Sequence, residues 1–269
     1  MSKRIELDGV TLAVEERGSS SEAGDGAVVF VHGLGGSSHS WWAQLAACEA
    51  HGHRAIAYDQ RGAGRSSKPS GPYSVELWAE DVERVLDRLG VERATLVGHS
   101  VGCMIVEHAA LRLGDRVRGL MMLGGALRWR PEAGPVFEER VRLAREGQMD
   151  EIAATVAQTG LSEGCRKANP ALWGLFRELI AANEPRAYAD WSAATASAEM
   201  TEPERLACPA LAACGELDPV TPPAFAEAIA AAIPNGRTAV IEGAAHWCQL
   251  EAPAAVSDLM LRFLDELAT

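Results

Sequence analysis

Short runs of continuously apolar residues recur along this 269-residue chain, and most are rich in β-branched side chains. A strand buried on both faces of a parallel sheet has this pattern, whereas a strand with one wet face alternates apolar and polar residues. The runs predict buried strands at residues 27–31, 54–58, 94–97, 117–123, 210–214 and 238–241. Alternating segments at 5–7 and 11–15, joined by Asp8-Gly9, instead predict an N-terminal hairpin, which a Gly/Ser-rich loop over 18–26 follows.

Helical periodicity fills most of the gaps between these strands and is clearest at residues 74–89. Ser74 is a good N-cap, Glu76 lies in the first turn where the helix dipole favours an acid, and Gly90 ends the helix. Strands that alternate with helices predict an α/β fold, with a mostly parallel twisted sheet and helices on both faces.

The alternation stops between residues 127 and 205, where the sequence shows no buried-strand pattern. Helical segments are predicted there instead, at 137–145, 151–157, 171–182 and 186–198. A helical insertion in an otherwise regular α/β chain is expected to cover one edge of the sheet as a cap. We therefore expect a core made of residues 1–126 and 206–269 and a helical cap or lid made of residues 127–205.

Charge, apolar runs and cysteine content limit which partners and which cellular compartment we expect. The net charge of −12 disfavours a nucleic-acid partner, because a phosphate backbone requires clustered Lys and Arg. No apolar run reaches the roughly 18 residues of a membrane span, and the first residues lack the apolar centre of a signal peptide. The six cysteines form no C-x-x-C pair and are expected to be reduced. A cytoplasmic protein is predicted; its oligomeric state is left open.

The stretch Gly98-His99-Ser100-Val101-Gly102 is a G-x-S-x-G motif that follows a predicted strand and opens a predicted helix. This strand–turn–helix setting is the one that a nucleophile elbow requires. The turn exposes the serine, and the helix N-terminus beside it favours developing negative charge. Ser100 is therefore the predicted nucleophile.

A serine hydroxyl needs a base to take its proton, and the base needs an acid to align it. His246 follows the last predicted strand, in the chain order serine, acid, histidine that this kind of elbow has. Asp218, after the strand at 210–214, is the predicted acid, with Glu216 as its competitor. The predicted triad is Ser100, Asp218 and His246.

Acyl transfer also requires two N–H donors for the oxyanion. Val101, directly after the nucleophile, and Leu34, in the loop His32-Gly33-Leu34-Gly35-Gly36, are the predicted backbone donors. His32 is expected to hold this loop rather than to act in catalysis. The substrate pocket is expected to include His99, Trp129, Trp191 and Trp247.

These motifs together resemble those of α/β-hydrolase superfamily serine hydrolases, over essentially the whole chain. The resemblance rests on the Leu34 loop, the stretch Asp59-Gln60-Arg61-Gly62-Ala63-Gly64-Arg65-Ser66, the Ser100 motif, Gly215-Glu216-Leu217-Asp218-Pro219 and the His246 loop. Within the superfamily the sequence looks most like 3-oxoadipate enol-lactonases and neighbouring carboxylesterases. The resemblance implies that Arg61 and its glycines support the floor of the site.

The leading hypothesis is hydrolysis of a small carboxylic ester or lactone, with no cofactor and no metal. A second enzyme hypothesis is hydrolysis of a carbon–carbon bond in a ring-cleavage product by the same triad, with Arg128 or Arg130 supplying positive charge. A hypothesis of another class is a ligand receptor on an inactive hydrolase fold. Ser100 disfavours epoxide hydrolases and haloalkane dehalogenases, since their counterparts on this fold use aspartate there.

Overall fold

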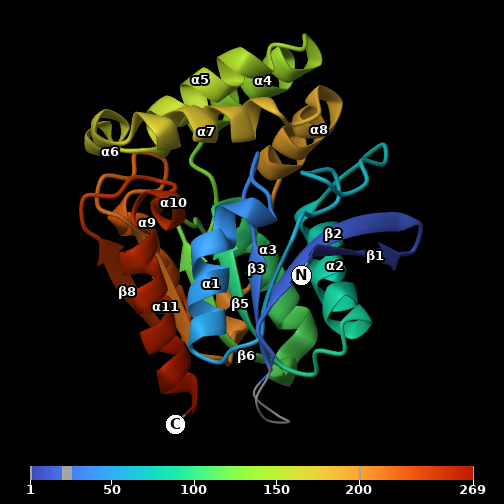
Figure 1. Ribbon diagram of the computed structural model, residues 1–269, viewed down its shortest axis with the longest axis vertical. Coiled ribbons are helices and arrows are strands. Elements are labelled where there is room, and N and C mark those ends of the chain that lie inside the picture. Colours follow the sequence, from blue (N-terminus) through green and yellow to red (C-terminus); the bar gives the residue numbers. More distant parts are fainter. Residues whose placement is uncertain (1, 20–25, 200, 269) are drawn as a thin grey trace.

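An eight-stranded mixed sheet lies at the centre of the computed structural model, which describes residues 2–19, 26–199 and 201–268 (Figure 1). The strands are β1 (Ser2–Leu7), β2 (Val10–Arg17), β3 (Ala27–Val31), β4 (Ala55–Tyr58), β5 (Ala94–His99), β6 (Val117–Leu123), β7 (Ala210–Gly215) and β8 (Gly236–Ile241). Their order is β1-β2-β4-β3-β5-β6-β7-β8, antiparallel from β1 to β4 and parallel from β4 onward. The predicted mostly parallel sheet and hairpin are confirmed; most of the loop expected at 18–26 lies outside the described residues.

Helices cover both faces of this sheet, and each face has its own apolar core. On one face, α1 (Trp42–Ala50) and α11 (Pro253–Ala268) bury Leu45 and Phe263 together with Phe30 of β3 (Figure 1). On the other face, α2 (Val75–Arg88), α3 (Val101–Leu113) and α9 (Pro223–Ala232) pack on alternate strand residues. Short helical segments η1 (Ser38–Trp41), η2 (Gly114–Arg116), η3 (Pro203–Arg205) and α10 (Cys248–Glu251) lie between these elements. Every strand from β3 to β7 is buried on both sides, which accounts for its continuous apolar sequence.

The helix expected at residues 74–89 forms with the predicted ends. The Ser74 hydroxyl accepts a hydrogen bond from the Leu77 N–H at 3.1 Å, and Gly90 follows the helix with a φ of 64°. The rings of Tyr73 and Trp78 lie 5.8 Å apart across this helix start. A good N-cap and a hydrophobic contact across it therefore fix where α2 begins.

Five helices form a layer above the carboxyl ends of the strands (Figure 1), and we call α4–α8 the cap. They are α4 (Ala133–Arg145), α5 (Met149–Gly160), α6 (Glu163–Ala168), α7 (Pro170–Ala181) and α8 (Pro185–Ala196). No described residue between 124 and 209 forms a strand, as expected. The sequence periodicity did not predict the short helix α6. The cap has its own apolar cluster, which also takes in Trp247 from the core. The domain limits at 127 and 205 stay a prediction.

Glu107 of α3 is a buried acid with few partners. The Thr201 hydroxyl donates to its Oε2 at 3.2 Å, while its Oε1 has no partner among the described residues. Burial raises the pKa of this carboxyl from its ordinary 4.5 to about 7. Between these two values the folded chain holds a proton that the unfolded chain has released.

The free energy of unfolding is therefore expected to fall as pH rises from 4.5 to 7, by at most about 3 kcal/mol from this group. Glu107→Gln should remove that fall, which urea unfolding at pH 5 and pH 8 measures. Glu138→Gln, at an exposed position of α4, is the matched control and should retain it. Equal pH dependence in the wild type and Glu107→Gln would contradict the assignment.

Within the described part of the chain, no helix combines the length and apolarity needed to cross a bilayer. The six cysteines are all free thiols, as the sequence predicted.

Candidate active site

Ser100 lies on a sharp turn between β5 and α3. Its φ of 55° and ψ of −123° are strained for a residue with a Cβ, and Asp8 is the other described non-glycine residue with positive φ. A Cβ on Gly102 would lie 2.4 Å from the Val31 carbonyl oxygen, and one on Gly98 2.5 Å from the Gly102 carbonyl oxygen. The two glycines of the motif are therefore needed because backbone passes directly against them.

His246 and Asp218 meet beside this turn. The Nδ1 of His246 lies 2.8 Å from the Oδ2 of Asp218, and both side chains are buried. An ionised carboxylate only accepts hydrogen bonds, so Nδ1 carries the proton and donates it. In the neutral form of this ring, Nε2 is the nitrogen without a proton.

The loop after β7 holds the Asp218 carboxylate with further donors. Backbone N–H groups of Val220 and Thr221 donate to Oδ1 at 2.8 and 2.9 Å, and the Thr221 hydroxyl donates to Oδ2 at 2.8 Å. Burial by itself would raise the pKa of Asp218, but His246 and these hydrogen bonds outweigh it, so the pKa lies below its ordinary value. Asp218 is therefore ionised at neutral pH.

Glu216, the competing acid, points elsewhere. Its side chain is exposed, and its Oε2 accepts a hydrogen bond from the Gly243 N–H at 2.9 Å. Of the two acids, the structure brings Asp218 to His246.

The two predicted oxyanion donors are Val101 and Leu34. Val101 is the first residue of α3, and Leu34 borders the same cavity as Ser100. Within the described residues, neither backbone N–H donates a hydrogen bond to the protein. Neither N–H group is therefore committed to another described residue.

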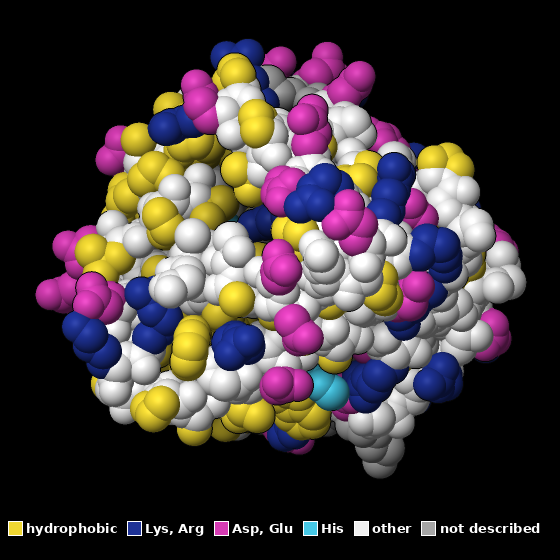
Figure 2. Space-filling model, turned by 90° about the horizontal axis from the view of Figure 1, so that it is seen from above, with side chains coloured by type: hydrophobic (Ala, Val, Ile, Leu, Met, Phe, Trp, Pro, Cys, Tyr) yellow, Lys and Arg dark blue, Asp and Glu magenta, His cyan; other side chains and the backbone are white. Residues whose placement is uncertain are grey.

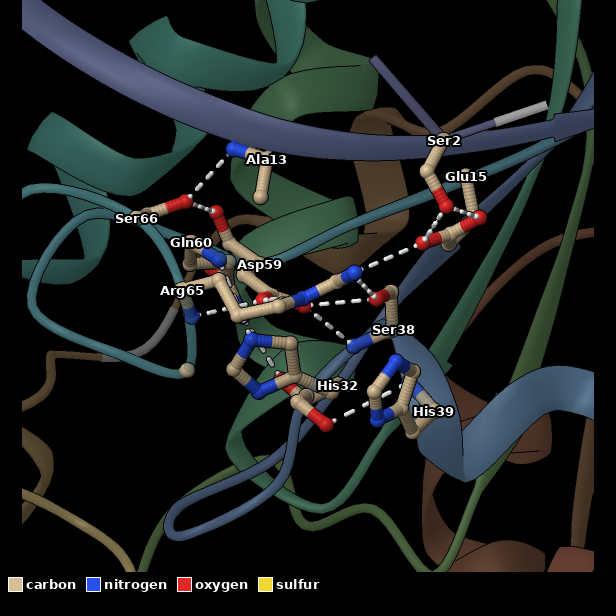
Figure 3. Close-up of polar contacts among 12 residues, drawn as sticks. Ser2, Ala13, Glu15, His32, Ser38, His39, Asp59, Gln60, Arg65 and Ser66 are labelled. Carbon is tan, nitrogen blue, oxygen red and sulfur yellow. Dashed lines mark hydrogen bonds and ion pairs between the residues drawn. The ribbon is translucent and has the colours of Figure 1, made fainter. Parts of the chain in front are cut away.

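His32 ties the Leu34 loop to the segment after β4 (Figure 3). Its Nδ1 lies 2.9 Å from the Gly33 carbonyl oxygen and donates to it, while its Nε2 accepts from the Gln60 N–H at 3.1 Å. The Gln60 amide donates back to the His32 carbonyl at 2.7 Å. Burial lowers the pKa of His32, so the ring is neutral. This geometry agrees with the expectation that His32 has a structural role.

The stretch 59–66 packs beneath that loop through buried charges. Asp59 accepts hydrogen bonds from both the N–H and the hydroxyl of Ser38, and from the N–H and guanidinium of Arg65 (Figure 3). Arg61 forms a paired hydrogen bond with the carboxylate of Asp81 on α2, at 2.5 and 2.6 Å. Arg61 thus anchors the loop to a helix and does not reach the cavity.

A narrow cavity of about 50 Å³ lies between Ser100 and the cap. Ser100, His246, His99, Trp129 and Trp247 all border it, in company with cap residues that sequence reasoning did not single out. These are Phe137, Arg140, Val156, Thr159, Gly160, Tyr188 and Thr195.

Trp191 does not border this cavity. Its ring stacks on Trp78 with centroids 3.7 Å apart, and its Nε1–H donates to the Arg61 carbonyl at 2.9 Å. It joins α8 to the core instead. Arg128 and Arg130 also lie outside the cavity, and the Arg130 guanidinium covers the ring of Phe225 at 4.5 Å.

His99 connects the turn before Ser100 to the His246 loop. Its Nε2 donates to the His246 carbonyl oxygen at 3.0 Å. Burial, helped by the neighbouring His246, lowers the pKa of His99 to about 3, so the ring stays neutral. His99 therefore holds the His246 loop and carries no charge into the cavity.

The cap is bonded to the same loop. The Trp247 N–H donates to the Gly160 carbonyl at 2.9 Å, and Glu251 accepts from the backbone N–H groups of both Ala245 and Ser162 at 3.0 Å. Sequence reasoning missed Glu251 and Thr221. The spacing Asp218-x-x-Thr221, typical of a side chain that caps its own turn, could have indicated the second of these.

Within the described residues, no group of three or more His, Cys, Asp or Glu side chains is arranged to hold a metal ion.

Comparisons with known proteins agree with this fold. Residues 26–253 match the family described as alpha/beta hydrolase fold. The chain is 28% identical over 242 residues to 3-oxoadipate enol-lactonase 2 of Acinetobacter baylyi, covering 88% of this chain and 89% of that protein. It is 29% identical over 238 residues to a protein named as a carbamate hydrolase, RutD, of Azorhizobium caulinodans, covering 87% and 89%.

Among solved structures, a thermophilic esterase from Thermogutta terrifontis, with malate bound, superposes with a TM-score of 0.91. It is 26% identical in sequence, and the match covers 100% of both chains. Sheet order, nucleophile turn and family match all point the same way, and the chain belongs to the alpha/beta hydrolase fold family.

Proposed function

We propose that this protein is a serine hydrolase that cleaves small carboxylic esters or lactones through an acyl-enzyme on Ser100. The observation that carries the proposal is that strained Ser100 and the Asp218-bound His246 border one cavity. Relatives named as an enol-lactonase and an esterase support an ester-type bond as the target.

The proposed reaction has two steps. In the first, His246 Nε2 takes the Ser100 proton as the hydroxyl oxygen attacks the carbonyl carbon, and the Leu34 and Val101 N–H groups stabilise the oxyanion. His246 then gives the proton to the departing alkoxide, which stays tethered through the acyl chain if the substrate is a lactone. In the second step, His246 removes a proton from water as the water oxygen attacks the acyl carbon. His246 then gives that proton to Ser100 Oγ as the ester bond to Ser100 breaks and the acid is released.

Labelling tests the nucleophile directly. A fluorophosphonate probe should modify Ser100, and peptide mass spectrometry should locate the adduct there. A neutral ester such as p-nitrophenyl acetate should be hydrolysed, and a γ-lactone should release acid in a pH-stat. No labelling of Ser100 and no turnover of either compound would contradict the proposal and favour a ligand receptor.

The carbon–carbon bond hydrolase is the second candidate, since it would use the same triad. Arg128 and Arg130, the cations expected to serve it, lie outside the cavity, whereas Arg140 borders it and could supply that charge. A dienoic keto acid in the same assay separates the two reactions. An aryl carbamate, included because of the RutD relative, tests whether the acyl carbon may carry nitrogen.

A further inference from the structure

Trp129, which lies between β6 and α4, borders two separate hollows. One is the narrow cavity of about 50 Å³ beside Ser100. The other, of about 590 Å³, is bordered by residues 127–131 and by Ala224, Phe225 and Ala228 of α9, and we call it the outer groove. Among the described residues, Trp129 is the one that borders both hollows, so it is placed as a partition between them.

The indole of Trp129 is held by two cap helices. Its Nε1–H donates to the Thr195 carbonyl oxygen of α8 at 2.8 Å. Its ring meets the ring of Phe137 on α4 edge-on, with the two centroids 5.4 Å apart. A chain that displaced the indole would have to break this hydrogen bond and this ring contact, so the partition is a fixed part of the cap.

The outer groove offers apolar surface beyond this partition. Leu127, Pro131 and Phe225 supply its large apolar side chains, and none of the described residues that border it is an Asp or a Glu. The Arg130 guanidinium covers the ring of Phe225 at 4.5 Å. An alkyl chain that reached this groove could bury its methylenes, each of which strengthens binding by up to about four-fold.

The catalytic cavity has little room of its own. A volume of about 50 Å³ holds a few water molecules or a short acyl group, whereas the outer groove, at about 590 Å³, is more than ten times larger. The face seen from above, over the cap, mixes acidic, basic and hydrophobic side chains (Figure 2), so no single charge there selects an uncharged ester. Selection among uncharged esters would therefore depend on the length of chain that fits beside Ser100.

We propose that Trp129 is a specificity-determining residue that closes the catalytic cavity toward the outer groove and so excludes esters with a long acyl or alkoxy chain. This inference rests on the proposed hydrolase function and adds the size of the substrate to it. A long chain on the scissile carbonyl would have to pass the indole, and a close-packed wall does not yield to extra methylenes without strain.

The test measures how kcat/KM depends on chain length. p-Nitrophenyl acetate and p-nitrophenyl hexanoate differ in the acyl chain, while ethyl acetate and hexyl acetate differ in the alkoxy chain. In the wild type, kcat/KM should fall by at least about tenfold from the short to the long ester of both pairs. Trp129→Ala should raise the long-to-short ratio of at least one pair by about ten- to hundred-fold, because the extra methylenes can then enter the outer groove.

Replacing Phe225 shows where the chain lies. Trp129→Ala/Phe225→Ala should lose several-fold of the gain, whereas Phe225→Ala alone should leave the ratio as in the wild type, because the indole still closes the groove. Trp173→Ala, a half-buried tryptophan of α7 that borders neither hollow, is the matched control and should leave both ratios unchanged. Trp129→Leu should give a smaller gain, and it replaces the alanine variant if circular dichroism shows that the latter is unfolded.

Binding to an inactive variant keeps the two proposals distinguishable. In Ser100→Ala, tryptophan fluorescence titration should show weak binding of the long esters, and Ser100→Ala/Trp129→Ala should bind at least one of them more tightly. Failure of the hydrolase proposal would appear as unlabelled Ser100 and no turnover of either acetate in the wild type. The partition is overturned if Trp129→Ala leaves both ratios as in the wild type, or if the wild type cleaves long esters as readily as short ones.

Discussion

Ser100→Ala is expected to lower kcat for a neutral ester by about 10⁴- to 10⁶-fold, because no other group can form the acyl-enzyme. The folded structure should persist, since alanine needs one fewer atom in the same turn, and a Cβ is already accommodated there at a φ of 55°. Steady-state kinetics with p-nitrophenyl acetate and circular dichroism measure the two quantities. The variant should also lose fluorophosphonate labelling.

Combining this change with His246→Ala should add little further loss. The two groups act as one unit, so removing the base matters only while the nucleophile is present. Ser197→Ala, an exposed serine at the end of α8, is the control and should retain full activity. Residual kcat within tenfold of the wild type in Ser100→Ala would show that another residue is the nucleophile.

Asp218→Asn is expected to lower kcat by about 10³- to 10⁴-fold while leaving KM for a neutral ester nearly unchanged. The carboxylate accepts the Nδ1–H of His246 at 2.8 Å through Oδ2. In the variant, the amide oxygen can still accept from Val220 and Thr221 at the Oδ1 position, which leaves an NH₂ facing His246. That NH₂ group can only donate, so Nδ1 has to accept and the ring proton moves to Nε2. A protonated Nε2 can no longer accept the proton of Ser100.

We expect kcat to fall and KM to change little, because the Asp218 carboxylate acts on His246 and does not border the cavity. The rate of fluorophosphonate labelling, measured as a function of pH, is an independent test. The wrong tautomer should slow the modification of Ser100 at every pH near neutrality. Asp258→Asn, an exposed acid on α11, is the matched control. A kcat unchanged in Asp218→Asn would exclude Asp218 as the orienting acid.

Links between the cap and the His246 loop have a consequence for how substrates are selected. The Trp247 N–H of the loop donates to the Gly160 carbonyl of the cap at 2.9 Å. Glu251 accepts from Ser162 of the cap region and from Ala245 of the loop, both at 3.0 Å. The cap wall of the cavity is thereby attached to the loop that carries His246. A shift of the cap is therefore expected to move His246 as well.

Local sequence determined the sheet, the helix ends and the nucleophile turn. Buried strands show as apolar runs, and Ser74 and Gly90 mark the ends of α2, because each depends on neighbours within a few residues. The G-x-S-x-G motif indicates its turn for the same reason: its glycines are required where backbone approaches backbone. Chain order then indicated His246 and Asp218, since parallel strands bring their carboxyl ends to one edge.

The tertiary structure alone decided the wall of the cavity. Trp129 and Trp191 look alike in the sequence, yet the first borders the cavity while the second stacks on Trp78. Arg128, Arg130 and Arg140 likewise share a region, and only Arg140 borders the cavity. Periodicity fixes which side of a helix is apolar, but the rotation and placement of cap helices over the sheet depend on packing between residues far apart in the chain. The sequence thus indicated Ser100, Asp218 and His246, and the placement of the cap decides which residues face them across the cavity.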